Sequence, residues 1–401
     1  MKKLFFYLIC GCLMYAATMT LQAQVQEDVS VRYYREFQVD SHNGKYGILF
    51  RSEVVVPYEY DNIIAQKDNR GFISQQNGKF GIIGVSIHYG DNARGMQLFS
   101  QQRRYFFEEE GKGRRAKGVN LFIIDIPCEY DEIKFTNGNF WVNKGDLKGV
   151  FTSGGGTILR CEFNDIKLTN GNYWVSKGDL KGVFTSGGGT ILPCNFDDIQ
   201  LTNGNYWVSK GDLKGVFTSG GGTILPCNFD DIKLTNGNYW VSKGNLKGVF
   251  TSGGGTILPC NFDNIQLTNG NYWVSKGDMK GVFTSGGGTI LPCNFDDIQL
   301  TNGNYWVNKG DLKGIFTSGG GTILRCEFND IKLTNGNYWV SKGDLKGIFT
   351  SGGGTILRCE FDKIELTSDN KYIAYKNGKK NFYSSGGGFL FTDSDVIYST
   401  E

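Results

Sequence analysis

Apolar and polar residues alternate in short runs along most of the chain, and glycine-containing turns separate the runs. In one stretch the runs are 173–177, 180–185, 190–194 and 198–202. A period of two predicts β-strands, because successive side chains of a strand point to opposite faces. Asn-Gly pairs such as Asn203-Gly204 favour the positive φ angles of tight hairpins. The stretch therefore predicts an antiparallel meander of short strands.

The meander recurs with a period of 33 residues, as the spacing from Trp141 to Trp174 shows. All seven tryptophans mark copies of it, at Trp141, Trp174, Trp207, Trp240, Trp273, Trp306 and Trp339. A fixed period of this kind indicates a repeat array. We predict an all-β tandem array of antiparallel β-meander units in an open solenoid or superhelix. A closed β-propeller is the alternative, although propellers usually have about four to eight blades and this chain has more units.

Departures from the repeat suggest where the parts of the chain begin and end. The predicted parts are a signal peptide at 1–23, an N-terminal linker or cap at 24–40, two degenerate repeats at 41–136 with a charged insertion at 84–121, seven near-identical repeats at 137–367, and a degenerate C-terminal capping repeat at 368–401. Terminal repeats are atypical in such arrays because they must cap an otherwise open stack.

The N-terminus has the pattern of an export signal. A basic start at Lys2-Lys3 precedes an apolar run, and Ala23 is the small residue at which we expect cleavage. Lipidation at Cys12 is a weaker alternative. The chain is therefore expected in the periplasm, at the cell surface or outside the cell. No later segment is apolar enough to cross a membrane, and a net charge of +2 gives no general attraction to nucleic acid.

The remaining cysteines occur once per repeat, at Cys128, Cys161, Cys194, Cys227, Cys260, Cys293, Cys326 and Cys359. Disulfides need Cα atoms within about 7 Å of each other, and a unit of several strands should separate equivalent residues by more. We therefore predict buried free thiols, with disulfides or metal binding as less favoured alternatives.

Two short patterns resemble the WG-repeat (KWG) family of bacterial proteins. The first is Asn43-Gly44-Lys45-Tyr46-Gly47, repeated from Asn77 to Gly81, and the second is the ending from Pro193 to Ile199. The resemblance covers about residues 41 to 392. The family's Trp-Gly pair is replaced by Lys181-Gly182, with the tryptophan upstream at Trp174. The resemblance implies an exported β-repeat protein without catalytic residues.

A search for chemistry finds no catalytic, cofactor or metal site. The two histidines, His42 and His88, lie far apart in the sequence. The Ser186-Gly187-Gly188-Gly189 turn lacks the Lys-Ser/Thr ending of a phosphate loop, and Asp197-Asp198 lacks a calcium-motif spacing, so both are predicted to be structural.

Aromatic residues are the main candidates for ligand contact. Tyr173 and Trp174 are adjacent, so one should face outward unless a second layer covers it. The candidate stripe is Tyr173, Trp174, Tyr206, Trp207, Tyr239, Trp240, Tyr272, Trp273, Tyr305, Trp306, Tyr338 and Trp339. The charged insertion is expected to be either a solvated hairpin or a candidate interaction loop that carries Arg103, Arg104, Arg114 and Arg115.

Three functions remain open at this point. The leading hypothesis is a non-catalytic scaffold that binds an unknown protein or glycan partner at many equivalent positions. The second is a structural spacer of the cell envelope, and the third, an enzyme, is strongly disfavoured. No cofactor is expected.

Overall fold

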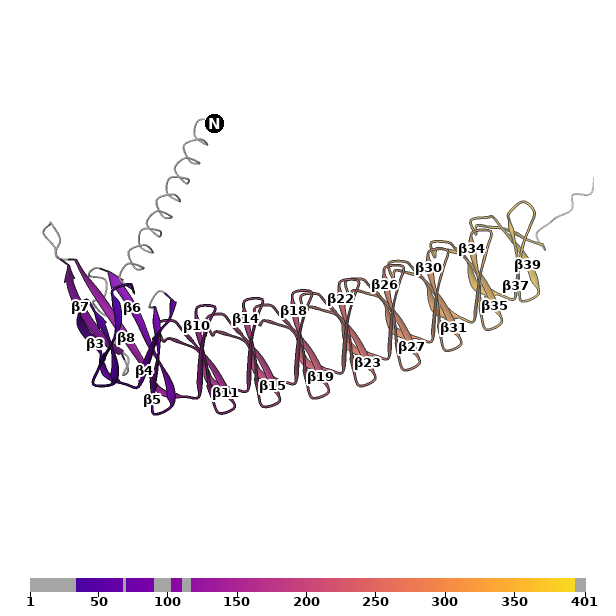
Figure 1. The fold of residues 1–401 in the computed structure, drawn as a ribbon. Coiled ribbons are helices and arrows are strands. Elements are labelled where there is room, and N and C mark those ends of the chain that lie inside the picture. Colours follow the sequence, from indigo (N-terminus) through magenta and orange to yellow (C-terminus); the bar gives the residue numbers. More distant parts are fainter. Residues whose placement is uncertain (1–33, 68–69, 90–101, 110–116, 394–401) are drawn as a thin grey trace, which may run out of the picture. The chain divides into compact units, whose positions relative to one another are not determined.

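The structure is a computed structural model that describes residues 34–67, 70–89, 102–109 and 117–393 (Figure 1). The predicted signal peptide, with Cys12, lies outside the described residues. The chain divides into two compact units, one of residues 1–210 with 219–221 and one of residues 211–218 with 222–401. We call them unit 1 and unit 2, and we describe each by itself.

Most strands of unit 1 are short, and β6 (Lys79–Tyr89) and β8 (Lys117–Tyr130) are longer because they extend into the charged insertion. In chain order the strands are β1 (Phe37–His42), β2 (Lys45–Phe50), β3 (Glu53–Tyr60), β4 (Asn62–Ala65), β5 (Gly71–Gln76), β6 (Lys79–Tyr89), β7 (Gln102–Glu109), β8 (Lys117–Tyr130), β9 (Glu132–Thr136), β10 (Asn139–Lys144), β11 (Leu147–Thr152), β12 (Thr157–Phe163), β13 (Asp165–Thr169), β14 (Asn172–Lys177), β15 (Leu180–Thr185), β16 (Thr190–Phe196), β17 (Asp198–Thr202) and β18 (Asn205–Lys210).

The strands of unit 2 continue the same pattern. They are β19 (Leu213–Thr218), β20 (Thr223–Phe229), β21 (Asp231–Thr235), β22 (Asn238–Lys243), β23 (Leu246–Thr251), β24 (Thr256–Phe262), β25 (Asn264–Thr268), β26 (Asn271–Lys276), β27 (Met279–Thr284), β28 (Thr289–Phe295), β29 (Asp297–Thr301), β30 (Asn304–Lys309), β31 (Leu312–Thr317), β32 (Thr322–Phe328), β33 (Asp330–Thr334), β34 (Asn337–Lys342), β35 (Leu345–Thr350), β36 (Thr355–Phe361), β37 (Lys363–Leu366), β38 (Tyr372–Lys376), β39 (Lys379–Tyr383) and β40 (Phe389–Thr392).

Each clean copy forms its own four-stranded antiparallel sheet. In unit 2 the sheets are β21–β24, β25–β28, β29–β32, β33–β36 and β37–β40, in chain order. Unit 1 contains β1–β3, a five-stranded sheet of order β4-β5-β6-β8-β7, β9–β12 and β13–β16. Within the described part of each unit the sheets follow one another in chain order and none is closed, so the predicted open all-β repeat array is confirmed.

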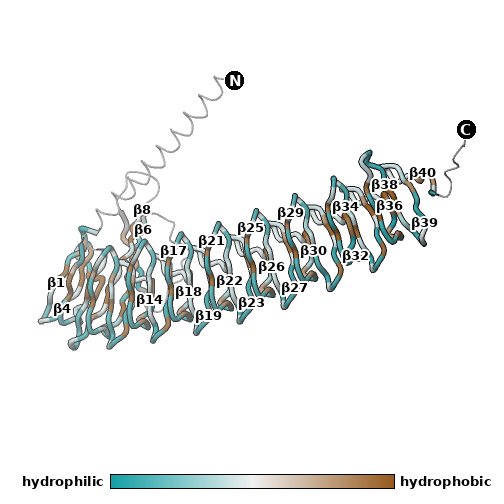
Figure 2. Tube along the Cα trace, turned by 90° about the vertical axis from the view of Figure 1, so that its right-hand side faces the viewer, coloured by the Kyte–Doolittle hydropathy of each residue, from teal (hydrophilic) through white to brown (hydrophobic). Residues whose placement is uncertain are grey.

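Successive sheets stack face to face, and the core lies between them. One cluster joins Val249 and Leu258 of the β21–β24 sheet to Tyr272 and Val274 of the next sheet. Figure 2 shows apolar segments recurring in strand after strand of the stack. Because an inner sheet has a neighbour on each side, it buries apolar residues on both faces, as layered β architectures require.

Glycine is required at two places in each clean repeat. Asn170 and Gly171 have φ angles of 51° and 76°, as a type I′ hairpin turn requires. Gly182 lies opposite a β-bulge of β16, and a Cβ added there would come within 2.7 Å of the Cys194 sulfur. Glycine therefore stands in the Lys181-Gly182 pair because the bulged strand leaves no room for a side chain.

The described part of the charged insertion forms paired strands with buried residues, where the sequence suggested a solvated hairpin or an interaction loop. It extends β6 and β8, which pair as far as Tyr89 and Val119, and adds β7 at the edge of the sheet. Val119 and Leu121 are buried with Phe50 of the first sheet. The insertion supplies apolar strand residues between its charges, and these bury themselves against β1–β3.

Candidate binding surface

The tyrosines of the candidate stripe are buried between sheets. Tyr173, Tyr206, Tyr239, Tyr272, Tyr305 and Tyr338 are only 1–2% exposed. The hydroxyl of Tyr272 accepts a hydrogen bond of 3.2 Å from Asn238 Nδ2 in the preceding sheet. The bond repeats at 3.3 Å between Asn271 and Tyr305. Each tyrosine therefore joins two sheets, and contact with a large ligand would require other side chains.

The tryptophans of the candidate stripe, Trp174, Trp207, Trp240, Trp273, Trp306 and Trp339, are half-buried. The Trp240 ring meets the Tyr272 ring of the next sheet edge to face, with centroids 5.8 Å apart. Trp273 and Tyr305 repeat this contact at 5.7 Å. Such pairs contribute about 0.5–1.5 kcal/mol beyond the burial of their area. The indoles therefore help to hold the stack together and leave only part of their surface to solvent.

The exposed apolar residues of the clean copies include leucines that the sequence did not single out. One leucine in the first strand of each sheet is 38–41% exposed, namely Leu168, Leu201, Leu234, Leu267, Leu300 and Leu333. We call these six residues the first-strand row. In β13, Leu168 follows the buried Ile166 on the same face. The repeated Asp-Ile-x-Leu-Thr pattern was the available signal, but alternation alone predicts burial for both apolar positions.

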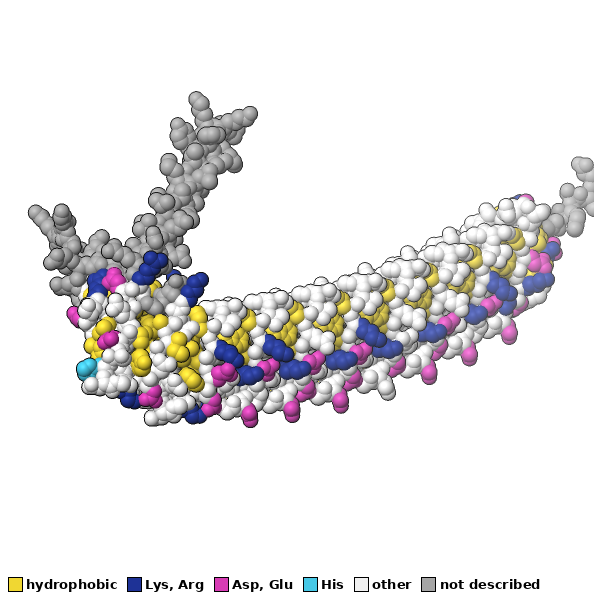
Figure 3. Space-filling view, in the orientation of Figure 1, with side chains coloured by type: hydrophobic (Ala, Val, Ile, Leu, Met, Phe, Trp, Pro, Cys, Tyr) yellow, Lys and Arg dark blue, Asp and Glu magenta, His cyan; other side chains and the backbone are white. Residues whose placement is uncertain are grey.

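The charged residues of the first strand alternate with its leucine and therefore lie on the other face of the strand. Lys214 of β19 pairs with Asp231 of β21 at 2.6 Å, and Lys233 lies 3.7 Å from the same carboxylate. The Lys214 ammonium is the largest cause of a lowered pKa at Asp231. Figure 3 shows hydrophobic side chains at regular intervals over the clean repeats, beside lysines and acidic residues. The ion pair of Lys214 with Asp231 therefore links neighbouring sheets and does not add to the face that carries the leucine.

The two aspartates of each Asp-Asp pair have separate structural roles. Asp297 pairs with Lys280 of the preceding sheet at 2.6 Å. The residue before it in the pair, Asp296, accepts a hydrogen bond from the backbone N–H of Gly310 in the next Lys-Gly turn. Across the described residues, no group of three or more His, Cys, Asp and Glu side chains is placed to hold a metal ion.

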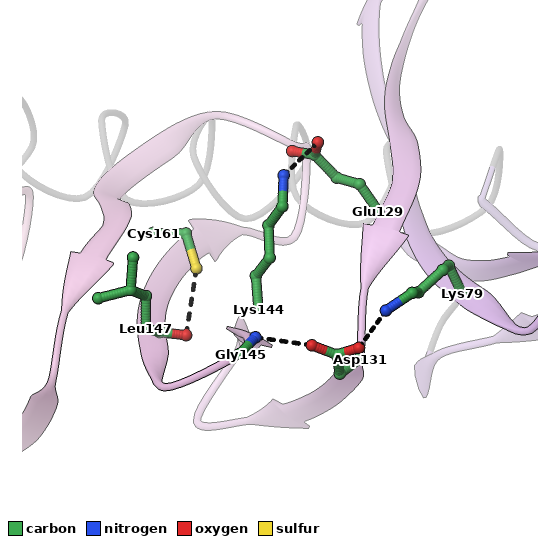
Figure 4. A network of polar contacts seen from close by, with 7 residues as sticks. All are labelled: Lys79, Glu129, Asp131, Lys144, Gly145, Leu147 and Cys161. Carbon is green, nitrogen blue, oxygen red and sulfur yellow. Dashed lines mark hydrogen bonds and ion pairs between the residues drawn. The ribbon is translucent and has the colours of Figure 1, made fainter.

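The same roles appear at the start of the clean repeats, in a network that Figure 4 draws. Asp131 accepts from Gly145 N at 2.7 Å and also pairs with Lys79 of the preceding sheet. Lys144 donates to Glu129 at 2.7 Å. The Cys161 thiol donates to the carbonyl oxygen of Leu147 at 3.3 Å. These contacts tie hairpin turns and neighbouring sheets together.

The eight cysteines Cys128, Cys161, Cys194, Cys227, Cys260, Cys293, Cys326 and Cys359 are free and half-buried. Burial raises the pKa of thiols such as Cys293, so the neutral form is favoured. The prediction of free thiols is confirmed, but the thiols are half-buried where the sequence predicted buried ones.

The glycine-rich turn is an intersheet contact. The N–H groups of Gly188 and Gly189 are used inside the turn, by Thr185 O at 2.9 Å and Thr185 Oγ1 at 2.9 Å. Gly188 has a φ of 86°, and a Cβ there would overlap the carbonyl oxygen of Ile158 in the preceding sheet. The turn therefore packs on its neighbour and does not direct these two donors at an anion.

Two of the four arginines of the candidate interaction loop can be placed. Arg103 pairs with Asp125 at 3.2 Å. Arg104 donates twice to Asn120 Oδ1, at 2.6 and 3.1 Å. Arg114 and Arg115 lie outside the described residues. The two placed arginines thus make contacts within their own sheet.

The repeat resemblance is confirmed by a family model. The model described as WG containing repeat matches residues 126–147, from the end of β8 to the first residue of β11. No curated protein matches the sequence. Among the described residues, no helix has the length and apolar character needed to cross a membrane.

Several solved structures are similar over much of the chain but superpose poorly. The extracellular domain of BT4673 from B. thetaiotaomicron is 8% identical, with 87% of this chain and 63% of that chain covered and a TM-score of 0.18. This chain thus spans less than two thirds of that structure. Hsv2p from Kluyveromyces lactis is 12% identical, with 77% and 94% covered and a TM-score of 0.17. Structural similarity at these TM-scores does not indicate a shared function.

Proposed function

We propose that this WG-repeat protein is an exported, non-catalytic scaffold that binds a protein or glycan partner at many equivalent positions. The first-strand row is the observation that supports this function most. It repeats one exposed leucine in sheet after sheet. Linked weak sites raise overall affinity because each further contact is intramolecular.

A structural spacer of the cell envelope is the second candidate. It is favoured because the repeated tyrosines and tryptophans make contacts between neighbouring sheets. Tyr272 is buried and bonded to Asn238, and Trp240 packs on its ring. A protein whose role is length alone would need these intersheet contacts and no particular surface.

Binding to immobilised glycans and peptides separates the two candidates. The chain from Gln24 onward would be compared with a variant carrying serine at the four first-strand leucines of unit 2, Leu234, Leu267, Leu300 and Leu333. A scaffold should bind at least one ligand class, and the variant should lose that binding. A chain that binds no immobilised ligand, or a variant that binds equally well, would favour the spacer.

Export has its own test. N-terminal sequencing of the protein recovered from outside the cytoplasm should begin at Gln24. A chain that retains Met1 and stays in the cytoplasm would contradict the exported location.

A further inference from the structure

We propose that the outer face of the β37–β40 sheet packs on the same face of a second copy of this chain, so that two copies join at that sheet about a two-fold axis. The inference goes beyond the proposed function and does not depend on any ligand. The face in question is turned away from the β33–β36 sheet, and no later strand of the described residues covers it.

Three apolar residues lie in register across this face. Ile373 of β38 is directly opposite Phe382 of β39, and Phe382 is directly opposite Phe391 of β40. Residues opposite each other in neighbouring strands share a face of the sheet. Tyr372 and Ala374, on either side of Ile373, are buried with residues of the preceding sheet, so the three residues point the other way. We call these three residues the end row.

The contact between the two preceding sheets indicates what a row of this kind packs on. In the β33–β36 sheet the equivalent residues are Trp339, Ile348 and Leu357, which lie opposite one another in the same way. Ile348 and Leu357 are only 0% and 3% exposed, because Tyr372 and its neighbours in the next sheet pack on them. Phe391 is 38% exposed. The end row therefore has the position and the apolar character of a surface that packs on another sheet.

The size of the side chains favours a partner with the same face. Between the preceding sheets, the aliphatic residues Ile348 and Leu357 of one face receive the aromatic ring of Tyr372 from the other. In the end row the two corresponding residues, Phe382 and Phe391, are themselves aromatic, and their rings stack with centroids 4.4 Å apart. Two end rows that face each other can therefore supply the aromatic volume that a close-packed contact between sheets needs.

Charge also favours the same face over the first sheet of another copy. The outer face of the first sheet carries the exposed Asp40, and burial of a carboxylate against apolar residues is costly. Beside the end row, Glu365 is opposite Ile373, and the Lys380 ammonium lies over the Phe382 ring at 5.1 Å from its centroid. Because this face has charges of both signs, two copies of it do not meet with a single sign of charge.

Sedimentation velocity of the chain from Gln24 tests the inference over concentrations from about 1 μM to about 1 mM. The range is wide because a contact made by one small sheet face lies at the weak end of protein interfaces. The chain should change from monomer to dimer as its concentration rises, and it should form no larger species. A two-fold contact uses the same face of both copies and is therefore closed.

Two variants change the end row without touching the buried face of the sheet. Phe391→Lys brings a like charge from each copy into the contact and should abolish the dimer. Phe382→Val combined with Phe391→Leu introduces the residues that an inner sheet carries at the same positions, Val249 and Leu258. This milder variant should remain folded and should weaken the dimer about tenfold or more, because smaller side chains leave cavities in the contact.

Phe389→Ser is the matched control. Phe389 is 57% exposed, which is more than Phe391, but it lies opposite Tyr383 on the side of the sheet that packs on the preceding sheet. This substitution should leave the dimer unchanged. Far-ultraviolet circular dichroism would verify that every variant is folded.

Three results would overturn the inference. The first is a chain that stays monomeric at every concentration, and the second is a dimer that survives Phe391→Lys or is lost equally in Phe389→Ser. The third is a series of species larger than a dimer that grows with concentration, which would indicate contact between the end row and the first sheet of the next copy.

Discussion

The middle glycine of the Ser-Gly-Gly-Gly turn should be essential for the stacking of sheets. Gly254 allows this to be measured. Gly254 lies between β23 and β24 at a φ of 87°, and an added Cβ would overlap the carbonyl oxygen of Ile224 in β20. Gly270, in the Asn-Gly turn between β25 and β26, has a φ of 76°, and an added Cβ would meet no atom within 4 Å. Gly270→Ala is therefore a matched control for backbone strain.

The two substitutions should differ by the cost of the intersheet clash. An L-residue in the left-handed region costs about 1–2 kcal/mol at either position. At Gly254 the methyl group must also push the two sheets apart, and overpacking of this kind costs about 1–3 kcal/mol. We expect Gly254→Ala to destabilise its sheet by about 1–3 kcal/mol more than Gly270→Ala destabilises its own.

Hydrogen exchange measured by mass spectrometry is the appropriate assay, because repeat arrays can lose all-or-none unfolding. The peptide that contains Asn245 identifies the β21–β24 sheet, since the other clean copies have aspartate at this position. Faster exchange in this peptide for Gly254→Ala is the expected result. Equal local destabilisation by the two substitutions would refute the argument that Gly254 is required by its contact with Ile224.

Three smaller effects follow from the intersheet contacts. Tyr272→Phe removes the hydroxyl that accepts from Asn238 and should cost about 1 kcal/mol in urea unfolding; an unchanged midpoint would contradict the bond. The lowered pKa of Asp231 means that its pair with Lys214 stabilises the fold above the unfolded pKa and is lost as pH falls through the folded pKa. Because the pair is exposed, Asp231→Asn should remove about 1 kcal/mol or less of stability at pH 7 and abolish that part of the acid dependence. The raised pKa of Cys293 should make its alkylation by iodoacetamide at pH 8 slower than that of free cysteine.

The local features of the fold could be predicted from the sequence because glycine and alternation specify them. Asn170-Gly171 predicted its hairpin, and the strand from Tyr173 to Lys177 was expected within one residue of β14. The functions of Tyr173 and Trp174 could not be assigned in the same way. Their adjacency requires opposite faces, but burial of both depends on neighbouring sheets that the local pattern does not describe.

The exposed leucines and the insertion were missed for the same physical reason. Leu168 alternates correctly with Ile166, yet it lies at the end of an outer strand, where the stacked neighbour covers less of it. The sequence of the insertion is rich in charged residues. Burial of Val119 and Leu121 becomes evident only from the pairing of β8 with β6. Both outcomes depend on contacts between segments distant in the sequence.

Each inner sheet packs one of its faces on the opposite face of the next sheet. This arrangement also explains why the terminal sheets depart from the repeat. A heterologous contact that does not close can continue without limit, so the first and last sheets must differ from the inner ones. In β1 the polar residues Asp40 and His42 alternate with buried Phe37, and Asp40 accepts from the Tyr58 hydroxyl at 2.6 Å. That face of the first sheet would have to bury a carboxylate to accept another sheet, which is costly. The N-terminal end of unit 1 is therefore built to stop the stack, whereas the inner sheets are built to extend it.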